Sequence, residues 1–233
     1  MEILLIGGLW LDGDVWSPVV EALEERGHRA VPLTLPGQGD GNDTATLEDQ
    51  RAAVIEAVDA ASAPPMVVGH SAACTLAWMA ADARPEAVEM VVLIGGFPSA
   101  DGERYADFFP VAQGAMPFPG WEPFDGPDSA DLDAAARASL ASRAIPVPEG
   151  VARGVVRLRD ERRYDVPTLL VCPEFSPEQA QEWIAGGDVP ELAKATALSL
   201  VDIDSGHWPM VSAPATLADL LSSAATERHA PAR

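Results

Sequence analysis

Short apolar runs alternate with amphipathic segments along most of this chain. The runs typical of buried strands lie at 3–6, 28–35, 66–68, 88–94, 168–172 and 197–203. The segments with helical spacing lie at 15–26, 46–61, 71–83, 178–185 and 215–223. Parallel strands joined by helical crossovers produce this alternation. It predicts an α/β fold with a mostly parallel central sheet of about six strands flanked by helices.

The length of 233 residues and a hydrophobic content of 48% fit one domain spanning residues 1–233. The alternation stops at about 97–163, where the sequence is rich in proline and aromatic residues and has two weak helical patterns, at 131–142 and 151–158. Long interruptions of this kind are functional or disordered. Aromatic side chains favour an ordered lid over an apolar pocket; they are Phe108, Phe109, Phe118, Trp121 and Phe124.

The formal net charge of -21 opposes binding to phosphate backbones and anionic lipids. No apolar run is long enough to span a membrane, and no basic leader precedes the first strand. We therefore expect a cytoplasmic protein with a small-molecule substrate and with no nucleic-acid or membrane partner. The densest basic cluster is interleaved with acidic residues, which favours a salt-bridged, solvated segment over an anion site; its arginines are Arg157, Arg159, Arg162 and Arg163.

A serine stands where a strand meets a helix, in the segment Val67-Val68-Gly69-His70-Ser71-Ala72-Ala73. A sharp strand-turn-helix junction exposes the serine hydroxyl above the sheet edge, as a nucleophile elbow requires. Gly69 and Ala73 are small enough for the strand and helix to approach closely. The alternative is an ordinary helix N-cap serine. We expect the turn to direct His70 away from this site.

A histidine follows the last strand, in Ser205-Gly206-His207-Trp208-Pro209. At that place it can reach across the sheet edge and act as general base for Ser71. After the first strand, the turn Gly7-Gly8-Leu9-Trp10 provides the Leu9 backbone N–H as an oxyanion donor, paired with that of Ala72. We expect apolar pocket walls from Trp10, Trp78, Phe97, Phe118, Trp121 and Trp208.

These motifs, in this order and together with Leu35-Pro36-Gly37-Gln38-Gly39-Asp40, resemble the α/β-hydrolase superfamily, in particular small bacterial esterase-like members. The resemblance covers nearly the whole chain and implies that the family's N-terminal strands are absent. Family members commonly carry the triad acid after the penultimate strand. Here Ser176 takes the usual aspartate position, so Glu174 is the first candidate for the acid, Asp101 the second, and Asp204 a third.

The resemblance implies a cofactor-free serine hydrolase of a small, largely apolar ester, lactone or thioester, acting through an acyl-enzyme. No metal is expected, because the four histidines are scattered and none has a partner four residues away. The displaced acid leaves an alternative open: a cofactor-free lyase, or a cyclase or isomerase, that uses the same serine and histidine without acylation. A ligand-binding protein without turnover is a third hypothesis.

Overall fold

The computed structural model describes residues 1–227, so the end of the predicted domain, residues 228–233, lies outside the described residues. Six parallel strands form the central sheet, in the order β2-β1-β3-β4-β7-β8. The strands are β1 (Glu2–Ile6), β2 (Arg29–Leu33), β3 (Met66–His70), β4 (Met90–Ile94), β7 (Thr168–Cys172) and β8 (Leu198–Asp202). The α/β fold class and the number of strands expected from the sequence are confirmed.

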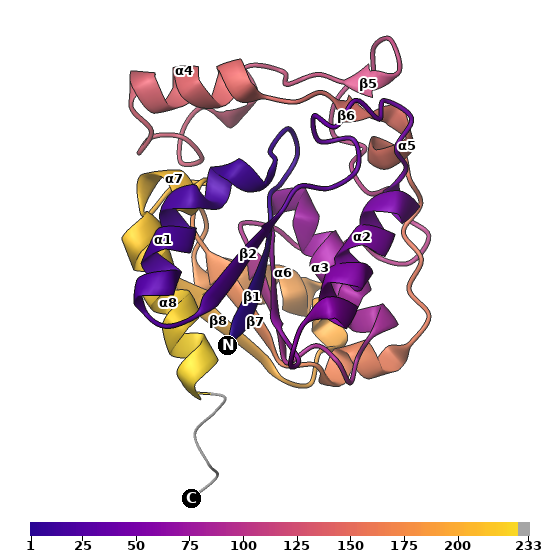
Figure 1. Cartoon of the computed structure of the whole chain (residues 1–233), viewed down its shortest axis with the longest axis vertical. Coiled ribbons are helices and arrows are strands. Elements are labelled where there is room, and N and C mark those ends of the chain that lie inside the picture. Colours follow the sequence, from indigo (N-terminus) through magenta and orange to yellow (C-terminus); the bar gives the residue numbers. More distant parts are fainter. Residues whose placement is uncertain (228–233) are drawn as a thin grey trace, which may run out of the picture.

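Helices cover both faces of this sheet (Figure 1). One face carries α1 (Ser17–Glu25), α7 (Pro209–Ser212) and α8 (Pro214–Glu227), and the other carries α2 (Leu47–Ala60), α3 (Cys74–Ala83) and α6 (Pro177–Gly186). Short 3-10 helices complete these layers: η1 (Gly13–Trp16), η2 (Ser71–Ala73), η4 (Glu161–Asp165) and η5 (Leu192–Lys194). Reciprocal capping boxes start two helices, with Thr46 and Asp49 at α2 and with Ser176 and Gln179 at α6.

Strand β1 shows why the sheet is buried on both sides. Leu4 and Ile6 join the apolar core beneath α2 and α3, whereas Ile3 and Leu5 join the core beneath α1 and α8. Side chains alternate between the two faces of a strand, so a strand with apolar residues at every position must be covered twice.

The segment of residues 97–163 follows β4 and runs into the first residues of η4 (Figure 1). It contains β5 (Ala115–Met116), η3 (Glu122–Phe124), α4 (Ala134–Arg143), β6 (Val147–Pro148) and α5 (Glu149–Ala152), and α4 crosses above the carboxyl ends of the strands. The helix expected at 151–158 is wrong beyond Ala152. The chain there is extended, because the Val156 N–H donates to the Glu103 carbonyl and the Gly102 N–H donates to that of Val156.

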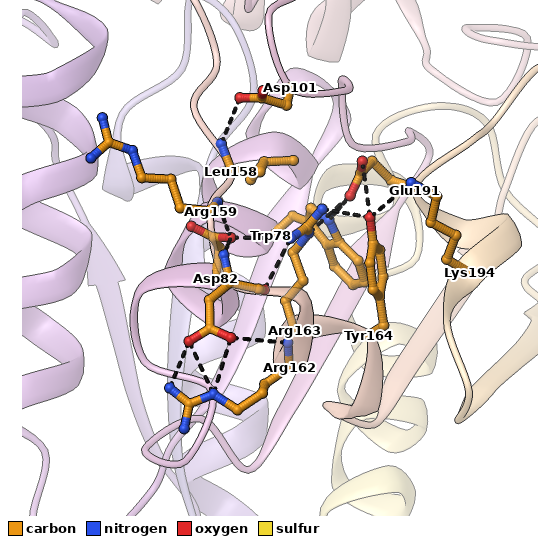
Figure 2. A network of polar contacts seen from close by, with 11 residues as sticks. Trp78, Asp82, Asp101, Leu158, Arg159, Arg162, Arg163, Tyr164, Glu191 and Lys194 are labelled. Atoms are coloured by element: carbon orange, nitrogen blue, oxygen red, sulfur yellow. Dashed lines mark hydrogen bonds and ion pairs between the residues drawn. The ribbon is translucent and has the colours of Figure 1, made fainter.

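The arginine cluster is not fully solvated, which corrects the sequence interpretation. Arg163 is only 5% exposed and lies between two buried carboxylates, 3.3 Å from Asp82 and 2.9 Å from Glu191 (Figure 2). Asp82 also accepts the backbone N–H groups of Arg159 and Asp160. This network fastens the end of the 97–163 segment to α3.

Two further observations bear on the expected environment. Cys74 and Cys172 are free and buried. Among the described residues, no helix is both long and apolar enough to cross a membrane.

Candidate active site

Ser71 occupies the sharp turn that its sequence context predicts. Strand β3 ends at His70, and Ser71 opens η2, which leads directly into α3. The φ angle of Ser71 is 55°, a left-handed conformation that residues other than glycine seldom adopt. Strain of this kind persists only where the surrounding structure imposes it, and it often occurs at functional positions.

His207 and Glu174 form a pair beside this turn. Their side chains are 13% and 14% exposed, and His207 Nδ1 lies 2.7 Å from Glu174 Oε1. A carboxylate only accepts hydrogen bonds, so His207 Nδ1 donates. The neutral imidazole then has an unprotonated Nε2, which is free to act as a base. The structure thus brings the first candidate acid into contact with the candidate base.

Asp101, the second candidate acid, is engaged elsewhere. Its Oδ1 accepts the backbone N–H of Leu158 at 2.9 Å, which ties the loop after β4 to the end of the 97–163 segment (Figure 2). The choice between the two carboxylates depends on contacts distant in sequence, and sequence reasoning left it open.

His70 corrects another expectation. It is 1% exposed, its Nε2 donates to the His207 carbonyl at 2.7 Å, and the two imidazole rings are 4.9 Å apart. Burial, and then the neighbouring His207, hold the pKa of His70 well below its usual range. His70 is therefore neutral and supports the backbone of the candidate base instead of pointing away.

The turn after β1 lies against Ser71. A Cβ atom added at Gly8 would be 2.9 Å from Ser71 Cβ, so only glycine allows this approach. The Leu11 N–H closes the turn on the Gly8 carbonyl at 3.3 Å. Leu9 within the turn and Ala72 beyond the serine therefore lie on chain segments that both adjoin Ser71.

A cavity of about 280 Å³ adjoins Ser71 and His207. Its walls are mostly aromatic or aliphatic, and its lining residues are Leu9, Trp10, His70, Ser71, Phe108, Phe109, Phe124, His207 and Trp208. Phe108 is 65% exposed, so it lies where the cavity meets solvent. The aromatic rings brace one another, with centroids 5.4 Å apart both for Trp10 and Phe109 and for Phe124 and Trp208.

Two of the six expected wall residues, Trp10 and Trp208, line this cavity. Trp78 does not, because it is fully buried and its indole N–H donates to Glu191 at 2.9 Å (Figure 2). Phe97 instead stacks on Phe175. The other two, Phe118 and Trp121, form a second layer behind Trp10 and Trp208.

The sequence interpretation missed His70 as a lining residue. The aromatic residues of the 97–163 segment that do line the cavity were expected there only as a group. They are Phe108, Phe109 and Phe124.

Comparisons with known proteins agree with this architecture. The model of the alpha/beta hydrolase family matches residues 3–220. Similar solved structures include an extracellular α/β-hydrolase from a Paenibacillus species, with TM-score 0.79, 18% identity, and coverage of 96% of this chain and 98% of that one. A pyrethroid hydrolase from Sphingobium faniae has TM-score 0.71, 20% identity, and coverage of 99% and 98%.

A variant of tomato methylketone synthase I, complexed with β-ketoheptanoate, has TM-score 0.71, 15% identity, and coverage of 97% of each chain. At these identities the likeness shows a shared fold. No curated protein matches the sequence. The family match, however, extends from the first strand into the last helix. The chain therefore belongs to the alpha/beta hydrolase family.

Proposed function

We propose that this protein is a serine hydrolase that cleaves a small, largely apolar ester, lactone or thioester through an acyl-enzyme. The observation that carries the proposal is the Glu174–His207 pair, 2.7 Å apart, beside the cavity that Ser71 and His207 both line. A serine, a histidine and a carboxylate with these roles recur in acyl transfer on several unrelated folds.

In the proposed reaction, Ser71 Oγ attacks the substrate carbonyl while His207 Nε2 takes its proton. The backbone N–H groups of Leu9 and Ala72 stabilise the oxyanion. His207 then protonates the leaving group and, in the second half-reaction, activates the water that releases the acid. Glu174 keeps the imidazole in the required tautomer and stabilises the imidazolium.

The cavity supports the proposed substrate class. Apart from the two histidines and Ser71 its lining is apolar, and among the lining residues none is an arginine, lysine, aspartate or glutamate. A substrate bearing a carboxylate would lose its hydration without gaining a partner. The volume of about 280 Å³ favours short acyl chains. We further propose that residues 97–163 act as a lid, since Phe108, Phe109 and Phe124 supply one wall.

The rival is a cofactor-free lyase, cyclase or isomerase in which Ser71 and His207 move protons without acylation. One similar fold is named a synthase and is complexed with a β-keto acid, so the fold alone does not decide between the two reactions. The Glu174 contact with His207 supports the hydrolytic proposal, because it provides a triad acid, and the displaced acid was what left the rival open.

Burst kinetics separate the two reactions. We expect p-nitrophenyl acetate and butyrate to give a burst of p-nitrophenol stoichiometric with the enzyme, and p-nitrophenyl octanoate to react more slowly. Ser71→Ala should abolish both the burst and covalent labelling by a fluorophosphonate. Ser199→Ala is the matched control, because this serine is exposed on the edge strand β8. Hydrolysis that persists in Ser71→Ala, or wild-type enzyme without a burst or labelling, would contradict the proposal.

A further inference from the structure

The backbone and ring of His207 are held from three separate parts of the chain. Glu174, after β7, accepts from the ring Nδ1 at 2.7 Å. His70, at the end of β3, donates to the His207 carbonyl at 2.7 Å. The backbone carbonyl of Asp128, in the 97–163 segment, accepts the His207 N–H at 2.7 Å. The first two contacts come from the carboxyl ends of strands in the central sheet, and the third comes from the segment that crosses above it.

The same segment also holds the residue before His207. Asp131 Oδ2 accepts the Gly206 N–H at 2.6 Å, a short charge-assisted hydrogen bond. The fit is so close that a Cβ at position 206 would collide with both the Asp128 carbonyl and the Asp131 carboxylate. Gly206 is therefore needed for the approach of this segment, independently of any turn that it makes.

The turn that carries Asp131 is fixed by its own contacts. The Ser129 hydroxyl, on a residue with no exposed surface, donates to the Phe124 carbonyl at 2.7 Å. Arg137 from α4 donates to the Ser129 carbonyl at 2.6 Å. Phe124 itself lines the cavity. One short, braced stretch thus joins a cavity wall to the loop that bears the candidate base.

We infer that Asp131 is a positioning residue for His207: its carboxylate clamps the Gly206 N–H and so holds the imidazole in line with Ser71 and Glu174. Asp131 is exposed and does not line the cavity, so it acts through the loop and not on the substrate. Its kinetic test rests on the proposed hydrolysis, whereas its spectroscopic test does not.

The experiment compares wild type with Asp131→Ala, Asp131→Asn and the control Asp133→Ala. Asparagine keeps an oxygen that can accept from Gly206, and alanine does not. Asp133 is a second carboxylate two residues away that caps α4 by accepting from the Ala136 N–H at 2.7 Å. Its removal tests general weakening of the segment without touching the Gly206–His207 loop.

For Asp131→Ala we expect kcat with p-nitrophenyl butyrate to fall between about 10- and 100-fold while KM stays within about two-fold. Asp131→Asn should recover most of the lost kcat, and Asp133→Ala should keep the wild-type kcat. NMR provides the readout that is independent of turnover. The downfield His207 Nδ1 proton should broaden or disappear in Asp131→Ala and persist in the other two variants.

Three results would overturn the inference: an unchanged Nδ1 proton in Asp131→Ala, equal loss of kcat in Asp131→Asn and Asp131→Ala, or equal loss in Asp133→Ala. If the wild-type enzyme shows no turnover that depends on Ser71, the proposed function fails. The Nδ1 proton then still decides whether Asp131 positions His207.

Discussion

Replacement of Glu174 by glutamine tests the acid assignment most directly. The substitution keeps the size of the side chain and an oxygen for His207 Nδ1, and it removes the negative charge. Glu174 Oε2 is buried and accepts no hydrogen bond among the described residues, so the new amide group would replace an oxygen that no donor holds. The hydrogen bond from His207 Nδ1 can persist in the resting enzyme, but the negative charge that stabilises the imidazolium is lost.

The geometry sets the size of the effect. Both side chains are largely buried, at 13% and 14% exposure, and the hydrogen-bonded atoms are 2.7 Å apart. Two unit charges about 4 Å apart interact by about 4 kcal/mol at an effective dielectric constant of about 20. Since each 1.36 kcal/mol changes a rate about ten-fold, Glu174→Gln should lower kcat about 10³-fold.

The assay is steady-state and pre-steady-state hydrolysis of p-nitrophenyl butyrate, with circular dichroism as a check on folding. Asp101→Asn is the matched control, because an asparagine oxygen can still accept the Leu158 N–H. It should keep nearly the wild-type kcat. A Glu174→Gln enzyme within about ten-fold of wild type, or an Asp101→Asn enzyme that is equally impaired, would refute the assignment.

Three further outcomes are expected. Gly8→Ala should lower kcat by at least about ten-fold in a folded enzyme, because the new methyl group meets Ser71; steady-state kinetics checks this. Arg163→Met should lower the free energy of unfolding by about 3–5 kcal/mol in urea titrations, since two buried carboxylates lose their partner, with little change in kcat per folded molecule. Burial lowers the pKa of His70 in the folded state. As the pH falls, the imidazole of His70 therefore becomes protonated at a higher pH in the unfolded chain than in the folded protein. The free energy of unfolding should therefore be highest above about pH 6.5 and should fall as the pH drops below that value. Urea titrations at several pH values measure this dependence. His70→Asn should make the free energy of unfolding depend less on pH, and its effect should be larger than that of His28→Asn.

Local sequence patterns predicted the features that depend on residues close together in the chain. The apolar run at 168–172 became β7 with the same bounds, because continuous β-branched and aliphatic residues fit a strand buried on both faces. Ser71 was located because a strand, a serine flanked by small residues and a helix follow one another directly in the chain. These features need no knowledge of distant contacts.

Features that depend on distant partners were not predictable in this way. Arg163 stands in a charged segment that reads as solvated, yet it pairs with carboxylates that lie 81 and 28 residues away in sequence. Trp78 is a large aromatic residue of the kind that lines pockets, but its indole N–H donates to Glu191 in the core. In both cases the deciding partner comes from another layer of the fold, where sequence periodicity carries no information.

The candidate acid shows how such a choice is made physically. Strands β4 and β7 are neighbours, so the loops that follow them both reach His207, and either can supply a carboxylate. Gly95, at the end of β4, has a φ of 58°, and a Cβ there would lie 3.2 Å from His207 Nδ1 and 3.3 Å from Glu174 Oε2. A larger residue would crowd the space that Glu174 fills. The glycine after β4 and the glutamate after β7 therefore depend on each other. Because Gly95 has no side chain, the long side chain of Glu174 has room to reach His207.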